Sequence, residues 1–275
     1  MMPEWYQEKP LGEYENIYVV AATEKVQPKR TAAGGGITAL LCYLIDNNMI
    51  DGAATSARDV EGLGGRIVVA RTREEIIRTA GNEWQVLPFT NKLMETIENE
   101  DLKKVAVVGL PCQIHFIRQM KTFPLVESNF GNRVQFLISL FCYGTFAHES
   151  ILNYIKEKHG MDISSIKEIK VSQKSVKFMG EKTLEIPFDE LSKYIHMGCL
   201  MCPDYTGAFS DISAGNIGGK TIMIVRNKIS EEILREAEGS GYISTSKCDE
   251  ETIKKIEERA VEKIKRASEY IPRLL

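Results

Sequence analysis

The sequence predicts an α/β fold, mixed α+β in detail, in which flanking helices cover a central, mostly parallel sheet. A smaller, hairpin-rich C-terminal part and a terminal helix should follow. Three observations support this prediction. Apolar runs typical of buried strands alternate with helical periodicity up to about residue 160. Apolar and polar residues then alternate over 166–191, as in a small sheet of hairpins. Two amphipathic helical patterns close the chain.

The first part of the chain predicts strands and helices in alternation. A polar, proline-containing arm reaches to about residue 15. The expected elements after it are a strand at 16–23, a loop at 27–36, a helix at 37–52, a strand and a helix within 65–81, a helix at 91–103, a buried strand at 104–112, a helix at 113–123, a buried strand at 133–145 and a helix at 148–160. We therefore expect residues 1–160 to form an α/β domain.

The second part has a different pattern. Residues 166–191 predict short strands around a central glycine, and 221–227 is an apolar strand. Amphipathic helices are expected at 229–241 and 249–271, the last with Glu and Lys four residues apart, which is typical of a solvated face. We expect 161–275 to form a smaller α+β part.

Composition and charge exclude several classes of protein. The 275 residues are 43% hydrophobic, enough for a substantial core, and the net charge is −3. The charges are spread along the chain without a basic patch, which argues against nucleic acid as a partner. No apolar run approaches about 18 residues, so no direct membrane span is expected. The start lacks the apolar core of an export signal, so we expect a cytoplasmic protein.

The six cysteines are not needed as disulfide staples in a chain of this length. In the cytoplasm they should be reduced, and so act as core residues, metal ligands or redox groups. Cys42 lies in an apolar helical pattern and is interpreted as a core residue. Cys248 lies in a polar stretch and has no predicted role.

Four cysteines form a candidate metal site. Cys112 and Cys142 each follow an apolar strand, and neighbouring parallel strands would bring both to the carboxyl edge of the sheet. Cys199 and Cys202 have the Cys-x-x-Cys spacing with which one turn supplies two thiolates. A lone strand-end cysteine is more often a core residue. Spacing does not decide between zinc and iron–sulfur, but two isolated ligands favour a cluster.

Two glycine-rich segments could bind an anionic cofactor. Gly34, Gly35 and Gly36 precede a helix whose N-terminus would attract anions, and Thr38 adds a hydroxyl. A plain tight loop is the alternative. The second segment, "DISAGNIGGKT", supplies Asp211, Ser213, Gly215, Asn216, Gly218, Gly219 and Lys220. Its alternative is a turn between two strands. No Ser–His–Asp order or carboxylate pair predicts a catalytic residue.

The motifs "GGGITALLCYLIDNNMIDGA", "VVGLPCQIHFIRQM", "LISLFCYGTF" and "GCLMCPDYTGAFSDISAGNIGG" span residues 34–219. In this order they resemble the beta-subunit family of coenzyme F420-reducing hydrogenases and dehydrogenases. The resemblance implies FAD at the two glycine-rich segments and one [4Fe–4S] cluster, with Cys112, Cys142, Cys199 and Cys202 as its ligands. It also implies hydride exchange between the flavin and coenzyme F420 as substrate. Expected partners are iron–sulfur redox subunits, of hydrogenase, formate dehydrogenase or a similar enzyme, or a ferredoxin.

Two departures from the family pattern leave alternatives open. Glu83 and Trp84 stand where members commonly carry a lysine and an aromatic residue, and the loss of a cation puts the hydride partner in question. No further ferredoxin-type run of cysteines is present, so electrons must come from another subunit or a soluble donor. The alternatives are a ferredoxin-linked flavin reductase with a different acceptor and a zinc-stabilised subunit without catalytic activity.

Overall fold

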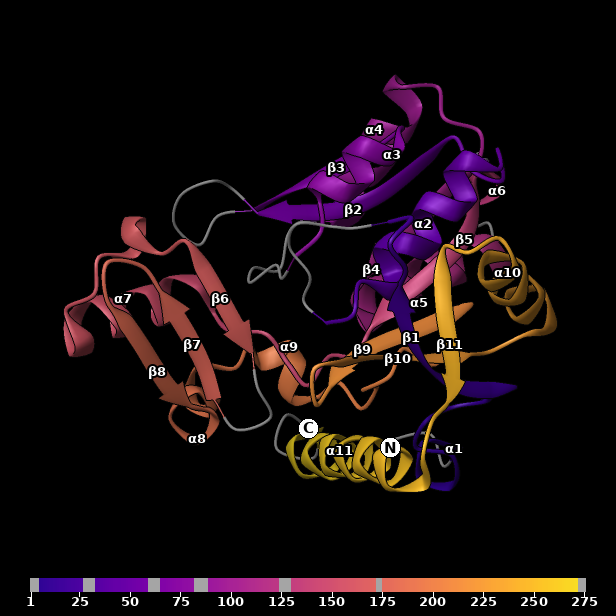
Figure 1. Ribbon diagram of the computed structural model, residues 1–275. Coiled ribbons are helices and arrows are strands. Elements are labelled where there is room, and N and C mark those ends of the chain that lie inside the picture. Colours follow the sequence, from indigo (N-terminus) through magenta and orange to yellow (C-terminus); the bar gives the residue numbers. More distant parts are fainter. Residues whose placement is uncertain are drawn as a thin grey trace.

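A large mixed sheet with helices on both faces forms the body of the protein (Figure 1). The computed structural model describes residues 5–26, 33–58, 65–81, 89–123, 130–171 and 175–271. The eight strands lie in the order β11-β1-β10-β9-β5-β4-β2-β3. They are β1 (Asn16–Ala22), β2 (Gly52–Arg58), β3 (Gly65–Ala70), β4 (Val105–Gly109), β5 (Val134–Leu140), β9 (Ile212–Ile217), β10 (Lys220–Val225) and β11 (Ile243–Lys247).

The centre of the sheet is parallel and its margins are antiparallel. The pairs β2–β4, β4–β5 and β5–β9 are parallel. The pairs β2–β3, β9–β10, β1–β10 and β1–β11 are antiparallel. Because β1 and β9 are both antiparallel to β10, the carboxyl ends of β1, β9, β5, β4 and β2 all lie at one edge of the sheet. The predicted fold class is confirmed.

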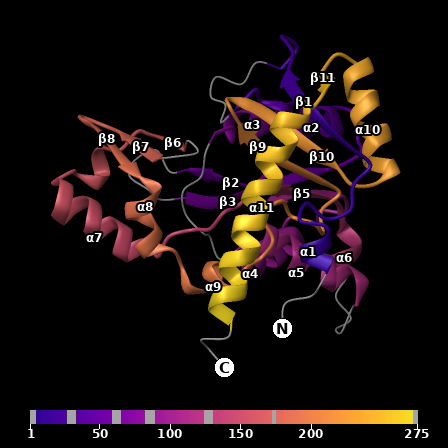
Figure 2. The ribbon, with the colours of Figure 1, turned by 90° about the horizontal axis from the view of Figure 1, so that it is seen from below.

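Helices cover the two faces of the sheet. On one face α2 (Gly36–Asp46), α3 (Arg73–Arg78) and α10 (Lys228–Gly239) pack against a continuous hydrophobic core. On the other, α4 (Phe89–Asn99) and α5 (Pro111–Thr122) cover β4 and β5, and the short α6 (Phe130–Arg133) lies beside them. The long α11 (Glu250–Tyr270) covers β1, β9 and β10, and contacts α1 (Trp5–Glu8), as Figure 2 shows.

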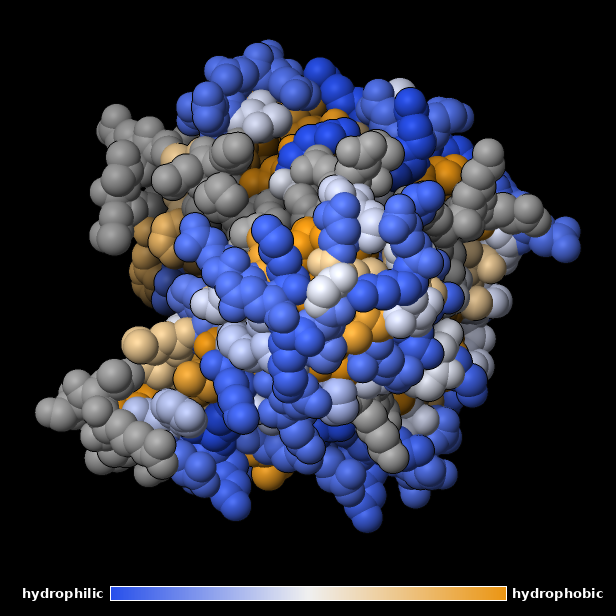
Figure 3. Space-filling view, turned by 90° about the vertical axis from the view of Figure 1, so that its left-hand side faces the viewer, coloured by the Kyte–Doolittle hydropathy of each residue, from blue (hydrophilic) through white to orange (hydrophobic). Residues whose placement is uncertain are grey.

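A smaller unit is inserted between β5 and β9. It contains α7 (His148–His159), the turn η1 (Ile163–Ser165), the antiparallel strands β6 (Glu168–Val171), β7 (Ser175–Met179) and β8 (Thr183–Pro187), then α8 (Phe188–Leu191) and η2 (Ser192–Tyr194). It has its own hydrophobic core, which includes Phe178. The smaller unit lies on the side of the molecule shown in Figure 3, and the surface seen from that side is mostly hydrophilic.

Local sequence explains where several elements begin. Pro111 opens α5, where its missing N–H costs nothing, and Gln113 accepts the Leu110 N–H at 2.8 Å. Asn227 and Asp249 cap α10 and α11 by accepting backbone N–H groups. No helix in the described part of the chain is long and apolar enough to span a bilayer.

Several details differ from the sequence prediction. Helix α2 ends at Asp46 rather than near residue 52, because Asn48 takes a positive φ there. The strands β2, β9 and β11 had no predicted counterpart. Strands β9, β10 and β11 join the same sheet as β1 to β5, so this sheet continues across the boundary expected near residue 160.

Candidate functional site

Two of the four candidate cysteines follow adjacent parallel strands. Strand β4 leads through Leu110 into Cys112 in the first turn of α5, and β5 leads into Cys142. The register pairs Gly109 with Ser139, so the two strands end side by side. The expected shared edge is therefore present. Phe141 and Cys142 continue the backbone pairing beyond β5 through bonds to Ala214 and Tyr205.

The Cys-x-x-Cys pair is brought to the same edge by the return of the chain from the smaller unit. Cys199 lies in the single turn α9 (Met197–Leu200), and Cys202 follows it. The segment after Cys142 pairs with the one before α9, since the His196 N–H donates to Thr145 O at 2.8 Å. The Thr145 hydroxyl lies 3.2 Å from the Cys199 sulfur. Two segments whose contacting residues are 54 positions apart in the sequence (Thr145 and Cys199) are thus joined beside the thiols.

The four thiols lie close enough to act on one another electrostatically. The pKa of Cys142 is raised to about 12, chiefly by burial; Lys263 lowers it, and negative charge at Cys199, Cys112 and Cys202 contributes to the rise. The pKa of Cys112 is raised by desolvation and then by Cys202 and Cys199. Cys112 is the most exposed of the set. All four sequence-predicted ligands are therefore neighbours in the fold.

Two cations of α11 bind the backbone of both cysteine segments. The Lys263 amine donates to the carbonyl oxygens of Cys142 at 2.6 Å and Asp204 at 2.7 Å. The Arg266 guanidinium donates to the carbonyl oxygens of Tyr143 at 2.6 Å and Cys199 at 2.9 Å. Each cation thus joins the segment after β5 to the segment that carries the pair of cysteines.

Sequence reasoning missed Lys263 and Arg266, because it assigned charges of the last helix to a solvated face. A signal was present. The buried positions of α11 include Ile256, Ala260 and Ile264, and Lys263 falls in the same stripe at helical spacing, with only 1% of its surface exposed. A lysine in the apolar stripe of a helix needs buried acceptors, and here these are backbone carbonyls.

The loop after Cys202 is ordered by Asp204. This buried carboxylate accepts the backbone N–H of Gly207 at 2.7 Å and of Ala208. The Cys202 thiol lies 3.8 Å from the Asp204 carbonyl oxygen. The position of the second cysteine of the pair is therefore fixed by a hydrogen-bonded turn rather than by a regular helix or strand.

The first glycine-rich segment lies at the carboxyl end of β1. The Ala22 N–H donates to Gly34 O at 2.7 Å, and Gly35 pairs with Ala21. Gly35 has φ 74° and precedes α2, whose N-terminus has no side-chain cap. A Cβ at Gly36 would lie 3.0 Å from Val20, so glycine also permits close packing on the strand. The amino end of α2, with Thr38 in its first turn, therefore faces the same edge as the cysteines.

The second glycine-rich segment is mostly strand. It forms β9, a two-residue turn at Gly218 and Gly219, and the start of β10 at Lys220. Both glycines have positive φ, as tight hairpin turns require, and Asn216 accepts the Gly219 N–H at 2.9 Å. The alternative prediction for this segment, a turn between two strands, therefore describes its backbone. The turn lies at the shared carboxyl edge, between β1 and β5.

The side chains of this segment have partners within the protein. Asp211 pairs with Arg118 at 2.7 Å and accepts the Leu137 N–H. Ser213 is buried and its hydroxyl accepts from Arg226 at 2.8 Å. Burial lowers the pKa of Arg226 to about 10. Gly215 allows the Phe141 ring to lie against the strand. These contacts account for the packing of Asp211, Ser213 and Gly215.

His115, Cys42 and Cys248 have structural roles. His115 stacks on Phe209 with ring centroids 3.8 Å apart, and burial lowers its pKa. Cys42 is fully buried in the core, as expected. Cys248 packs against the core beneath α11. Glu83 and Trp84 lie outside the described residues. Within the described ranges, no three Cys, His, Asp or Glu side chains are arranged to hold a single metal ion.

Comparison with known proteins places this geometry in a family. The model described as "Coenzyme F420 hydrogenase/dehydrogenase, beta subunit N-term" matches residues 17–94, and the corresponding C-terminus model matches 102–251. The coenzyme F420 hydrogenase subunit beta of Methanosarcina barkeri is 27% identical over 263 residues, covering 92% of this chain and 90% of the relative. The coenzyme F420-dependent sulfite reductase of Methanocaldococcus jannaschii is 32% identical over 221 residues, 74% of this chain but 34% of that protein.

The fold agrees with the sequence matches. A chain of the F420-reducing [NiFe] hydrogenase complex from Methanosarcina barkeri superposes with a TM-score of 0.88, at 26% identity, and covers 96% of this chain and 93% of that one. The fold and the family models define a class of subunits found in redox enzyme complexes. The chain belongs to the coenzyme F420 hydrogenase/dehydrogenase beta-subunit family.

Proposed function

We propose that this chain is an electron-transfer subunit that holds one [4Fe–4S] cluster and FAD and exchanges a hydride with coenzyme F420. The observation that carries this proposal is the gathering of Cys112, Cys142, Cys199 and Cys202, from three separate segments, at one edge of the sheet. When bound, the cluster would supply single electrons and the flavin would couple them to two-electron transfer.

The donor set suits an iron–sulfur cluster. Four thiols are the ligands that such clusters use, and the two adjacent cations offset their negative charge once they ionise. Arg266 also has Nε and Nη1 atoms that are buried without an acceptor in the described structure. Since the folded, metal-free protein holds the Cys142 proton tightly, cluster binding should release protons from the thiols.

The edge beside the cysteines suits an anionic cofactor such as FAD. Gly34, Gly35, Gly36 and Thr38 present an uncapped helix N-terminus there, which favours a phosphate group. The β9–β10 turn, with Gly218, Gly219 and the exposed Lys220, is two strands nearer to Cys142. In this proposal the turn and the helix end bind the flavin nucleotide, while the buried Ser213 and the half-buried Asp211 and Gly215 position the strand beneath it.

Partner subunits are part of the proposal. The relatives are named as subunits of hydrogenase and related enzymes, so electrons would reach this chain from an iron–sulfur subunit or a ferredoxin. Cys112 is the most exposed of the four cysteines, so in this proposal a partner approaches the site at this residue.

An anaerobic cofactor inventory tests the proposal. Isolated protein should contain four iron, four sulfide and one flavin per chain, as the cofactor set requires. A colourless protein with zinc would favour the zinc-stabilised subunit instead. The reduced protein should then be mixed with coenzyme F420 in the absence of oxygen, and the flavin should reoxidise.

A second candidate keeps the cluster and flavin but has another acceptor. It is favoured by Glu83 and Trp84, which stand where members of the family commonly carry a lysine and an aromatic residue. A flavin that ferredoxin can reduce but coenzyme F420 cannot reoxidise would support this candidate over the first.

A further inference from the structure

The buried Lys263 and the half-buried Arg266 lie beside the cysteine site on one side of α11. Lys263 and Arg266 are three residues apart and therefore lie one helical turn from each other. Figures 1 and 2 both show α11 passing alongside α9, the turn that carries Cys199, and the two helices are in contact. Lys265, the other basic residue between positions 263 and 266, is exposed.

Hydrogen bonding fixes the position of both charges. Lys263 donates to the carbonyl oxygens of Cys142 and Asp204, and Arg266 to those of Tyr143 and Cys199. The Arg266 guanidinium also lies 4.4 Å from the centre of the Tyr143 ring. The acceptors in these four contacts are neutral carbonyl oxygens, so no carboxylate offsets either positive charge there.

The charges of Lys263 and Arg266 lie beside two of the candidate ligands. The Lys263 amine is 2.6 Å from the carbonyl oxygen of Cys142, and the Arg266 guanidinium is 2.9 Å from that of Cys199. A positive charge held in place stabilises any further negative charge that arrives beside it. Adding one electron to a cluster held by four thiolates is such a change.

Arg266 contributes in a second way. Its Nε and Nη1 atoms are buried and have no hydrogen-bond acceptor in the described structure. Buried donors of a charged group are costly when unsatisfied, so an acceptor is expected to complete the site. Sulfur atoms of a cluster beside Cys199 are acceptors of this kind, and hydrogen bonds to them raise the reduction potential.

We propose that Lys263 and Arg266 are the positioning residues that set the reduction potential of the cluster, by holding both cysteine segments and placing two positive charges beside them. This inference rests on the proposed function, since it requires a cluster at the four cysteines. It predicts that loss of either charge makes the cluster harder to reduce.

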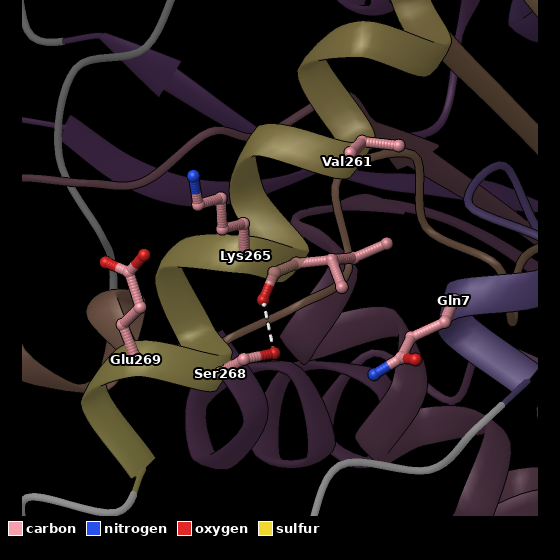
Figure 4. Close-up of a pocket in the computed structure, with 6 residues that line it drawn as sticks. Gln7, Val261, Lys265, Ser268 and Glu269 are labelled. Atoms are coloured by element: carbon pink, nitrogen blue, oxygen red, sulfur yellow. Dashed lines mark hydrogen bonds between the residues drawn. The ribbon is translucent and has the colours of Figure 1, made fainter.

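The test separates charge from hydrogen bonding. Lys263→Gln and Arg266→Gln keep a side-chain N–H donor and remove the charge. The control is Lys265→Gln, which removes one positive charge from the exposed side of α11. Lys265 and Glu269 project from that side one turn apart, next to an open groove of about 340 Å³ that Gln7 and Val261 also line (Figure 4). Midpoint potentials are measured on the full chain by anaerobic titration with electron paramagnetic resonance.

Lys263→Gln and Arg266→Gln should each lower the equilibrium constant for one-electron reduction at least about tenfold. This corresponds to a midpoint potential that is about 59 mV more negative. Lys265→Gln should leave it unchanged. Wild-type midpoint potentials in both Lys263→Gln and Arg266→Gln would overturn the inference. If the Gln variants lose the cluster, Arg266→Lys decides: retention of the cluster supports the need for charge, and its loss refutes it. Wild-type protein without iron would instead refute the proposed function.

Discussion

Gly215 offers a sharp test of how β9 is packed against the cysteine segment. A Cβ at this position would overlap three atoms of the Phe141 ring, the farthest at 2.8 Å. Ordinary contact begins near 3.4 Å, so even that atom must move by about 0.6 Å and the other two by more. Phe141 directly precedes Cys142, and its N–H donates a hydrogen bond to the carbonyl oxygen of Ala214 on β9. A shift of Phe141 therefore also displaces Cys142, the candidate ligand.

Gly215→Ala should therefore destabilise the protein by about 1–3 kcal/mol, the usual cost of overpacking a core. The free energy of unfolding is measured in urea on cofactor-free, reduced protein. The matched control is Gly239→Ala at the end of α10, where a Cβ meets nothing within 4 Å. It should be neutral or stabilising by up to about 1 kcal/mol.

The two roles available to Gly215 give different results. If its only role were to let a cofactor approach, the stability of the cofactor-free protein would not change. Equal unfolding free energies for Gly215→Ala and wild type would thus refute the packing argument. We also expect lower iron content in this variant after anaerobic reconstitution, because Phe141 must move and Cys142 with it.

Three further predictions follow from single contacts. Cys199→Ser should lose iron severalfold while Cys248→Ser retains it, and equal iron content in the two variants would contradict the ligand assignment. Gly35→Asp should weaken FAD binding about fivefold relative to Gly35→Asn, since only the former adds a negative charge at the α2 N-terminus; fluorescence titration with FAD measures this. Arg118→Met should cost about 1–3 kcal/mol of unfolding free energy by leaving Asp211 without its ion pair, and an unchanged urea midpoint would refute this role.

The sequence could predict that the four cysteines are neighbours, because its signals were local; their role as ligands stays a prediction. Each of Cys112 and Cys142 ends an apolar run typical of a buried strand, and parallel neighbours share a carboxyl edge. Only the pairing of β4 with β5 had to be assumed, and the register bears it out. Cys199 and Cys202 were recognised from their spacing, although their approach depends on a long excursion through the smaller unit.

The strands β9 and β11 could not be predicted from local pattern. The β9 sequence contains Gly215 and Asn216, residues that disfavour strands in isolation. It becomes a strand because β5 and β10 pair with it on both sides. The edge strand β11 is largely polar and is held by β1 alone in the described sheet. In both cases tertiary pairing overrides intrinsic preference.

Lys263 shows the same limit for side chains. Periodicity placed it on a helix, but a lysine is usually solvated, and its acceptors are carbonyl oxygens more than 50 residues away in the chain. No sequence pattern marks a backbone carbonyl as a buried partner. The charged part of the site therefore emerges only once α11 is placed across the sheet.

Anomalous diffraction at the iron absorption edge, on crystals grown without oxygen, tests the central claim most directly. We predict one compact iron peak within bonding distance of the sulfur atoms of Cys112, Cys142, Cys199 and Cys202. An iron peak that leaves any of these sulfur atoms uncoordinated, or a zinc signal in its place, would contradict the assignment.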